Sequence, residues 1–153
     1  MTEDITDDDL KASADAARLT CACFALRQAA RQITRLYEAK MAHLGLSAGQ
    51  FSILTALVLH DEANFTDLAT GLGMDRTSLS RALRPLERSG FVTLSPEGRK
   101  RRRTAKIAPA GRQKYAEALP FWQQAQAKAA RQFGQRDWPA LAVQLSDLVE
   151  THT

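Results

Sequence analysis

The chain has 153 residues, enough for one domain or for a small domain with appended helices. It is 44% hydrophobic, as globular proteins are, and its net charge of +4 is compatible with a nucleic-acid partner. No apolar run reaches the ~18 residues of a membrane span, and the acidic N-terminus lacks the basic region typical of a signal peptide. Two cysteines are too few for a disulfide framework, so we expect a cytoplasmic protein that does not enter a membrane.

The N-terminal part of the sequence predicts an acidic tail followed by a long helix. Residues 1–14 are rich in aspartate and are interpreted as a disordered tail. The alternative is a tail that covers the basic surface of its own protein when DNA is absent. Apolar residues then recur at intervals of three and four, which predicts an amphipathic helix over residues 19–44. Its stripe consists of Leu19, Cys23, Leu26, Ala30, Ile33, Tyr37, Met41 and Leu44.

A second and more apolar helix is predicted from Ala48 to about His60. Ser47 and Gln50 have the spacing of a capping box at its start. Apolar residues occupy nearly every side of this helix, which indicates that it is buried on several sides and forms the centre of the fold. After it, Asn64 or Thr66 is expected to cap a further helix.

The segment 67–81 has the spacing of a helix-turn-helix. Ala69 is small enough for two helices to cross closely, Gly73 suits the turn between them, and Asp75 is placed to cap the second helix. The second helix has two unlike faces, because leucines recur on one side and hydroxyls and arginines on the other. The inward stripe consists of Leu79, Ala82, Leu83 and Leu86, and the outward face carries Thr77, Ser80, Arg81, Arg84 and Arg88. Side chains of the outward kind reach base edges and phosphates in the major groove of DNA.

A basic β-hairpin follows the helix stop at Ser89–Gly90. Residues 91–94 and 104–107 have strand character, and residues 95–98 have turn chemistry. Between the strands lie five adjacent cations, Arg99, Lys100, Arg101, Arg102 and Arg103, which repel one another unless a polyanion is near. Such a run also fits a nuclear-localisation signal or a membrane-surface patch. Its place at the tip of a hairpin, directly after a helix-turn-helix, favours a DNA-contacting wing.

Two more helices are predicted after the hairpin. Pro109-Ala110-Gly111 opens the first, whose apolar stripe runs from Tyr115 to Phe133, and Asp137 caps the second. Together with the helix at 19–44, they carry more apolar surface than one small winged domain can cover. We therefore expect a homodimer, which also matches two DNA half-sites about 34–36 Å apart.

Taken in order, these segments resemble the MarR family of winged-helix transcriptional regulators. The motifs are Leu46–Phe51 entering the central helix, Met74–Arg81 with Leu83–Gly90 in the recognition segment, and Ile107–Gly111, which is similar to the family's Leu-Thr-x-x-Gly. The resemblance covers residues 19–151. Two positions depart from the family pattern. Arg99 stands where the family wing has an acid, which leaves Glu97 as the substitute for bracing Arg101, and Ala108 replaces a threonine that caps the following helix.

The resemblance implies a mostly α fold with a small β-hairpin wing. A winged helix-turn-helix occupies residues 46–108 of a domain spanning 15–153, with dimerisation helices at 15–45 and 109–153. It implies a sequence-specific, double-stranded-DNA-binding repressor that acts as a homodimer on a palindromic operator. It also implies release of the DNA when a small aromatic or phenolic anion binds between the dimerisation and DNA-binding parts. The residues assigned to DNA contact are Arg76, Thr77, Ser78, Ser80, Arg81, Arg84, Arg99, Lys100, Arg101, Arg102 and Arg103.

Chemistry of other kinds is not indicated by the sequence. It has no glycine-rich phosphate loop, nucleophile motif or paired carboxylates, so we expect neither an enzyme nor a cofactor, and its histidines show no metal spacing. Cys21 and Cys23 are about 200° apart on a helix, which disfavours a disulfide between them. Cys23 is interpreted as a core residue and Cys21 as the better redox candidate. The alternative functions are an architectural nucleic-acid binder and a protein-binding winged-helix module.

Overall fold

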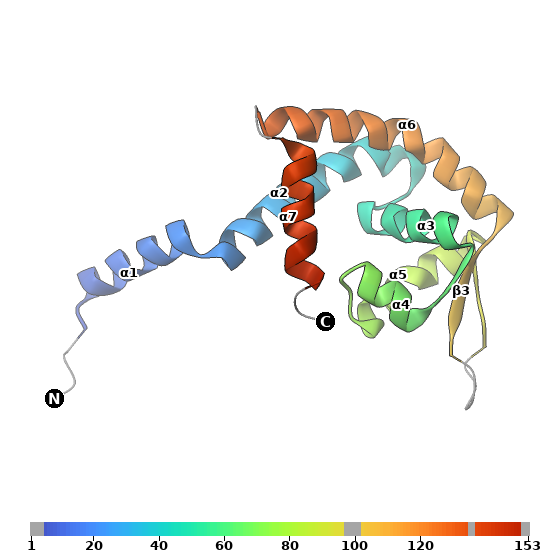
Figure 1. The fold of residues 1–153 in the computed structure, drawn as a ribbon, viewed down its shortest axis with the longest axis horizontal. Coiled ribbons are helices and arrows are strands. Elements are labelled where there is room, and N and C mark those ends of the chain that lie inside the picture. Colours follow the sequence, from blue (N-terminus) through green and yellow to red (C-terminus); the bar gives the residue numbers. More distant parts are fainter. Residues whose placement is uncertain (1–4, 97–101, 135–136, 151–153) are drawn as a thin grey trace. The chain divides into compact units, whose positions relative to one another are not determined.

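The computed structural model describes residues 5–96, 102–134 and 137–150, and the chain divides into two units, residues 1–36 and 37–153. The first unit holds helix α1 (Asp7–Thr20) and most of helix α2 (Ala22–Met41). The second unit continues with η1 (Ala42–Leu44), α3 (Ala48–His60), β1 (Glu62–Asn64), α4 (Phe65–Gly71), α5 (Arg76–Arg88), β2 (Val92–Leu94), β3 (Thr104–Ile107), α6 (Pro109–Gln132) and α7 (Trp138–Glu150) (Figure 1). The mostly helical class with a small β-wing is confirmed.

Helix α1 corrects the expectation of a disordered acidic tail. Residues 7–14 are helical, whereas residues 1–4 lie outside the described residues. The helix begins with a capping box, in which the Asp9 N–H donates to Thr6 Oγ1 (3.2 Å) and the Thr6 N–H donates to Asp9 Oδ2 (3.1 Å). Acidic side chains in the first turn also interact favourably with the helix dipole, so their density favoured a helix start rather than disorder.

The long helix predicted over residues 19–44 is interrupted at Cys21. This residue has an extended backbone (φ −72°, ψ 109°), and it separates α1 from α2. Its sulfur accepts a weak hydrogen bond from the Phe24 N–H (3.4 Å) at the start of α2. Both cysteines are exposed, so the interpretation of Cys23 as a core residue is wrong in the single chain. The sequence does not indicate this break, because no glycine or proline lies near Cys21 and the apolar periodicity continues across it.

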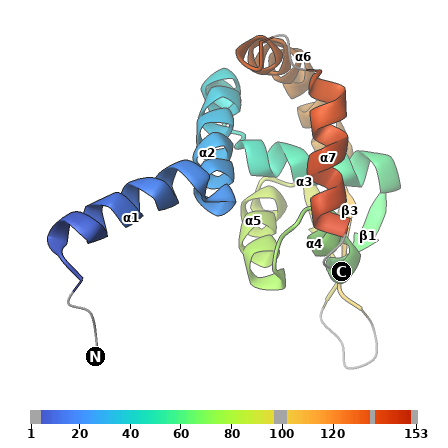
Figure 2. The same cartoon turned by 60° about the vertical axis from the view of Figure 1, so that its left-hand side comes forward.

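Helix α3 is the centre of the second unit, as its sequence predicted. The capping box at its start is confirmed: the Gln50 N–H donates to Ser47 Oγ (3.2 Å), and the Ser47 N–H donates to Gln50 Oε1 (2.9 Å). Its buried side chains are Phe51, Ile53, Leu54 and Leu57. Each such burial stabilises the fold by about 1.5–3 kcal/mol. The helix lies between α6 and α5 (Figure 2) and contacts both, so it connects the recognition segment to α6.

Among the described residues, no single helix is both long and apolar enough to cross a membrane. The segments Ala22–Leu44 and Ala48–His60 have the length and composition of a membrane span only when both are counted as one.

The sheet has three antiparallel strands in the order β1-β3-β2, one strand more than the predicted hairpin. In β1, Ala63 pairs with Ala105 of β3, and Leu94 of β2 pairs with the same residue from the other side. Glu62 begins β1, and the exposed Asp61 before it forms ion pairs with Arg112 Nη2 (2.6 Å) and Lys106 Nζ (3.4 Å). A three-residue strand is too short for its alternation to stand out in a sequence.

The start of α6 explains the glycine of its motif. Gly111 is buried, and a Cβ at this position would lie 2.0 Å from the Phe91 carbonyl oxygen and 3.1 Å from Ile107 Cγ1. The same carbonyl accepts a hydrogen bond from the Ala108 N–H (3.0 Å). Ala108 makes no side-chain cap, as expected from the missing threonine. Close backbone contact therefore sets the position of α6 against the corner between α5 and β2.

We expect Gly111→Ala to lower the free energy of unfolding by about 1–3 kcal/mol or more, because the new Cβ overlaps backbone atoms that have little freedom to move. Urea unfolding at fixed protein concentration measures this change. Gly49→Ala is the matched control, since a Cβ there meets no atom within 4 Å. Equal stabilities of the two variants would contradict the close-contact explanation.

Candidate nucleic-acid interface

Helices α4 and α5 form the predicted helix-turn-helix. Asn64 caps α4 by accepting the Asp67 N–H (3.0 Å), which decides between the two predicted caps. The turn contains Gly73 at φ 61°, and Ala69 is buried as expected for a close crossing. Asp75 caps α5, with the Ser78 N–H donating to its Oδ1 (2.8 Å). The start of the recognition helix α5 is thereby anchored by local hydrogen bonds.

The two faces of α5 are separated as the sequence predicted. Leu79, Leu83 and Leu86 are at most 1% exposed and belong to the core. The outward residues are exposed or half-buried and comprise Arg76, Thr77, Ser78, Ser80, Arg81, Arg84 and Arg88. The Ser78 hydroxyl donates to Asp75 Oδ2 (2.6 Å), so its proton is engaged in the cap of the helix.

The cap changes the acidity of Asp75. Hydrogen bonds from the side chain and backbone of Ser78 hold the pKa of the Asp75 carboxyl below its ordinary value of 3.8. The carboxylate is therefore ionised whenever the protein is near neutral pH. Its negative charge faces the helix N-terminus, where the helix dipole favours it.

A concavity of about 540 Å³ lies on the outward face of α5. It is lined by Phe65, Arg76, Thr77, Ser80, Arg81, Arg84 and Arg103. Four of these side chains are cationic, two bear hydroxyls and none is acidic. Five residues of the predicted set from α5 and one from the arginine run are therefore brought to one surface.

Arg103 lies at the base of the wing and not at its tip. Its guanidinium carbon is 4.7 Å from the centre of the Phe65 ring, and the Phe65 N–H donates to the Arg103 carbonyl (2.9 Å). The Nε atom of Arg103 is buried without a hydrogen-bond partner. Phe65 was not among the predicted site residues, because an apolar residue that opens a helix gives no functional signal in a sequence.

Three of the five predicted wing cations lie outside the described residues. Arg99, Lys100 and Arg101 lie outside the described residues, as does Glu97, so the bracing acid stays a prediction. Arg102 is described and exposed. At the base, the Ser95 N–H donates to the Thr104 carbonyl (2.9 Å), and the Thr104 N–H donates to Ser95 Oγ (2.8 Å). These bonds close the described part of the hairpin next to α5.

The sequence and the fold agree on the relatives of this chain. Residues 44–103 match the model of the MarR family. The DNA-bound crystal structure of the M. tuberculosis transcriptional regulator MosR is 30% identical, with a TM-score of 0.76, and the match covers 86% of this chain and 96% of MosR. The chain belongs to the MarR family of winged-helix transcriptional regulators. Its relatives are regulators and not enzymes.

Other comparisons agree with this family assignment. A second crystal structure of MosR is 29% identical over 89% of this MarR-family chain and 98% of its own, with a TM-score of 0.76. A probable transcriptional regulator from Pseudomonas aeruginosa is 22% identical over 84% of this chain and 97% of its own, with a TM-score of 0.72, which supports the fold alone. No curated protein matches the chain in sequence.

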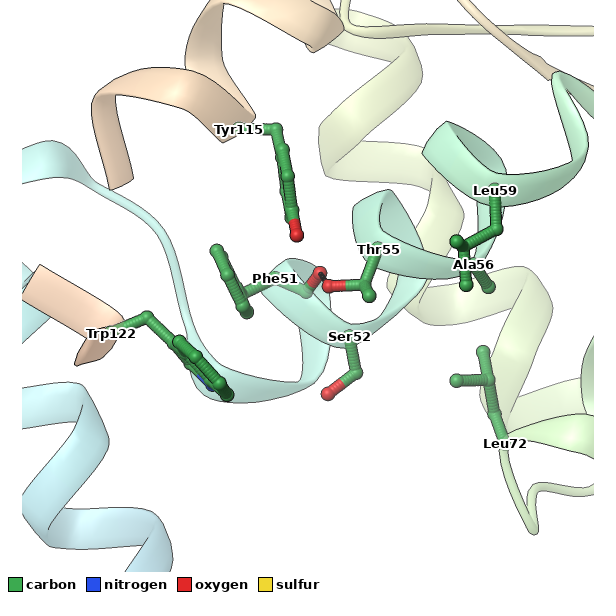
Figure 3. A pocket seen from close by; sticks show the side chains of 8 residues that line it. All are labelled: Phe51, Ser52, Thr55, Ala56, Leu59, Leu72, Tyr115 and Trp122. Atoms are coloured by element: carbon green, nitrogen blue, oxygen red, sulfur yellow. Dashed lines mark hydrogen bonds between the residues drawn. The ribbon is translucent and has the colours of Figure 1, made fainter. Parts of the chain in front are cut away.

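A second cavity of this MarR-family chain, of about 380 Å³, lies between α3 and α6 (Figure 3). Its lining residues are Phe51, Ser52, Thr55, Ala56, Leu59, Leu72, Tyr115 and Trp122. The Phe51 ring stacks on those of Tyr115 (5.0 Å between centroids) and Trp122 (6.0 Å). The Ser52 and Thr55 hydroxyls donate to the Ala48 and Phe51 carbonyls, so they are already partnered. No lining side chain carries a charge.

The described part of the chain contains no candidate metal-binding site. Histidine, cysteine, aspartate and glutamate side chains form no group there that is arranged to hold a metal ion.

We expect Asp75→Ala to lower the midpoint of thermal unfolding, while Asp75→Asn retains most of the cap, because an amide oxygen also accepts the Ser78 N–H. A carboxylate whose pKa is lowered by folding stabilises the folded protein fully when the pH is above the pKa of the unfolded chain. This stabilisation is lost as the pH falls through the pKa of the folded protein. Below pH 3.8, wild type should therefore lose stability relative to Asp75→Asn. Thermal melts by circular dichroism across this range measure the difference, and parallel curves would contradict the cap.

Proposed function

We propose that two copies of this chain bind one DNA duplex at a palindromic operator and repress transcription there. The observation that carries the proposal is the concavity on α5, where four arginines and two hydroxyls meet without a carboxylate. Such a surface matches base edges and phosphates, and it attracts DNA through release of condensed counterions. The relative MosR, at 30% identity, has a structure in complex with DNA.

The N-terminal helices support the homodimer. None of the side chains of α1 is buried, and Met41 is the only buried residue of α2. Leu10, Leu19, Phe24 and Leu26 are 43–69% exposed. Helices with so little burial gain little stability from packing in a single chain, and a second copy supplies the missing apolar surface. Two recognition helices held in this way reach half-sites about one helical turn apart.

Repression needs only occupancy of an operator that overlaps a promoter. A dimer that holds both half-sites excludes other proteins from the same stretch of duplex, and this needs no contact beyond those to DNA. An architectural binder would use the same charges without sequence preference, and a protein-binding module would not require them. Sequence preference therefore separates the three functions.

We expect selection from random duplex DNA to recover a palindrome, bound by a dimer in analytical ultracentrifugation. Arg81→Ala should relax the preference at its base position, because a bidentate arginine–guanine contact discriminates by about 1–3 kcal/mol. Arg102→Ala is the matched control: it should weaken binding to all sequences alike and reduce the salt slope by about 1. An unenriched pool would contradict the operator. Equal losses for Arg81→Ala on operator and random DNA would contradict its assignment.

We further propose that the cavity between α3 and α6 takes a small aromatic effector. Three stacked aromatic rings and an apolar lining fit a flat molecule. An anion would lose its hydration in this cavity without gaining a cationic partner from the lining residues. The cavity therefore favours an uncharged aromatic ligand over the anion expected from the family. A ligand that binds better to a DNA-free arrangement of α3 and α6 would release the operator by shifting that equilibrium.

We expect methyl 4-hydroxybenzoate to bind at least tenfold more tightly than its anionic parent, 4-hydroxybenzoate. Fluorescence in a Trp138→Phe background reports on Trp122, which lines the cavity. Ser52→Phe is the control, because this exposed side chain borders the cavity and a phenyl group there would fill it. Tighter binding of the anion, or binding that Ser52→Phe leaves unchanged, would contradict the uncharged ligand class.

A further inference from the structure

The aromatic cavity between α3 and α6 continues into a second concavity, the α3–α4 groove. The groove has a volume of about 580 Å³ and is lined by the end of α3, by β1 and by α4. We propose that it takes a cationic group, so that the effector is an uncharged aromatic ring with an extended ammonium tail. This inference rests on the proposed effector site and deepens it, because it names the chemical class of the part of the ligand that lies beyond the ring.

The first argument is that the groove and the aromatic cavity share a wall. Ala56, Leu59 and Leu72 line both of them. Figure 3 shows these three side chains at the end of the cavity away from Trp122. The path follows α3 from Phe51 to the last residue of the helix, nine residues on, and at about 1.5 Å per residue this is roughly 13–14 Å. One elongated molecule with its ring against Phe51 can therefore lie in both sites.

The second argument is the apolar surface that lines this path. Leu59 is 73% exposed, the highest fraction of any large apolar side chain that the structure describes. It lies on the wall that the cavity shares with the groove, beside the half-buried Ala56 and Leu72. An alkyl chain laid over these side chains would remove apolar surface of both molecules from water, which favours binding. The linker between ring and charge is therefore expected to be a hydrocarbon chain.

The third argument is the charge at the far end of the groove. Its polar lining consists of His60, Glu62, Asn64 and Asp67, and no lysine or arginine of the described residues belongs to it. Two carboxylates thus border an apolar groove in a chain whose net charge is +4. A metal ion is not the matching cation, because the described histidine, cysteine, aspartate and glutamate side chains form no group that could hold one. An organic cation fits both the charge and the apolar wall.

The fourth argument is that the described part of the protein leaves these carboxylates without a cationic partner. Neither Glu62 nor Asp67 forms an ion pair there. Lys106 stands opposite Glu62 in the sheet, but its ammonium group pairs with Asp61 (3.4 Å). Asp67 Oδ2 accepts a hydrogen bond from Asn64 Nδ2, a neutral donor that leaves the charge in place. An ammonium group, with three donors and a positive charge, complements such an acceptor pair.

The test compares three esters of 4-hydroxybenzoic acid, namely the methyl, heptyl and 6-aminohexyl esters. The heptyl ester has the chain length of the aminohexyl ester without its charge. Trp122 fluorescence in the Trp138→Phe background measures binding. We expect the aminohexyl ester to bind at least tenfold more tightly than the methyl ester, because its chain covers Leu59 and its charge meets the carboxylates.

Substitutions in the groove separate the charge from the chain. We expect Glu62→Gln to weaken binding of the aminohexyl ester about fivefold, as loss of a solvent-accessible ion pair does, and to leave the heptyl ester unchanged. Asp67→Asn, which removes the other carboxylate, should act in the same direction. Glu38→Gln is the matched control, because it removes an exposed carboxylate of α2 outside the groove and should change neither affinity.

The inference is overturned if the aminohexyl ester binds no more tightly than the methyl ester. It is also overturned if neither Glu62→Gln nor Asp67→Asn weakens the aminohexyl ester more than the heptyl ester. Both results leave binding of the methyl ester intact, and with it the proposed aromatic site. Failure of the methyl ester to bind would instead overturn that site, and this inference with it.

Discussion

Burial of one side of α5 is the constraint on which its outward, arginine-rich surface depends. Leu79, Leu83 and Leu86 are almost completely buried, and α5 packs against α3, the most apolar helix of the chain. Because a helix cannot turn its leucines inward without turning the opposite side outward, this packing alone decides where Arg81 and Arg84 lie. The charges contribute little to folding. Their arrangement follows from the hydrophobic core beneath them.

The base of the wing extends this surface beyond the recognition helix. β3 occupies the middle of the sheet, between β1 and β2, and its N-terminal end brings Arg103 against Phe65 at the start of α4. At its other end, Asp61 joins Lys106 of β3 and Arg112 of α6, and the Arg112 hydrogen bond is the main cause of the lowered pKa of Asp61. The base of the wing, the start of α4 and the start of α6 are thus connected by short contacts around one strand.

The cavity between α3 and α6 stands next to this connected region. Both helices contribute its lining, and α6 reaches its position through the close contact of Gly111 with the Phe91 carbonyl. A ligand among Phe51, Tyr115 and Trp122 would therefore press on the helix that carries Arg112. This gives a physical route by which an aromatic molecule would act on the wing, with the packing of α3 against α6 as the element that changes.

The sequence by itself determined the helices from α3 onward, the caps at Ser47 and Asp75 and the two faces of α5. These features follow from local hydrogen bonds and from periodicity, which need no knowledge of distant residues: Ser47, Asp75 and Gly90 act within their own turns. Only the tertiary structure decided the break at Cys21, the strand β1, the packing of Arg103 on Phe65 and the uncharged lining of the α3–α6 cavity. The break at Cys21 depends on the backbone conformation of one residue, and the other features depend on contacts between residues far apart in the chain. Neither cause produces a periodic pattern in the sequence.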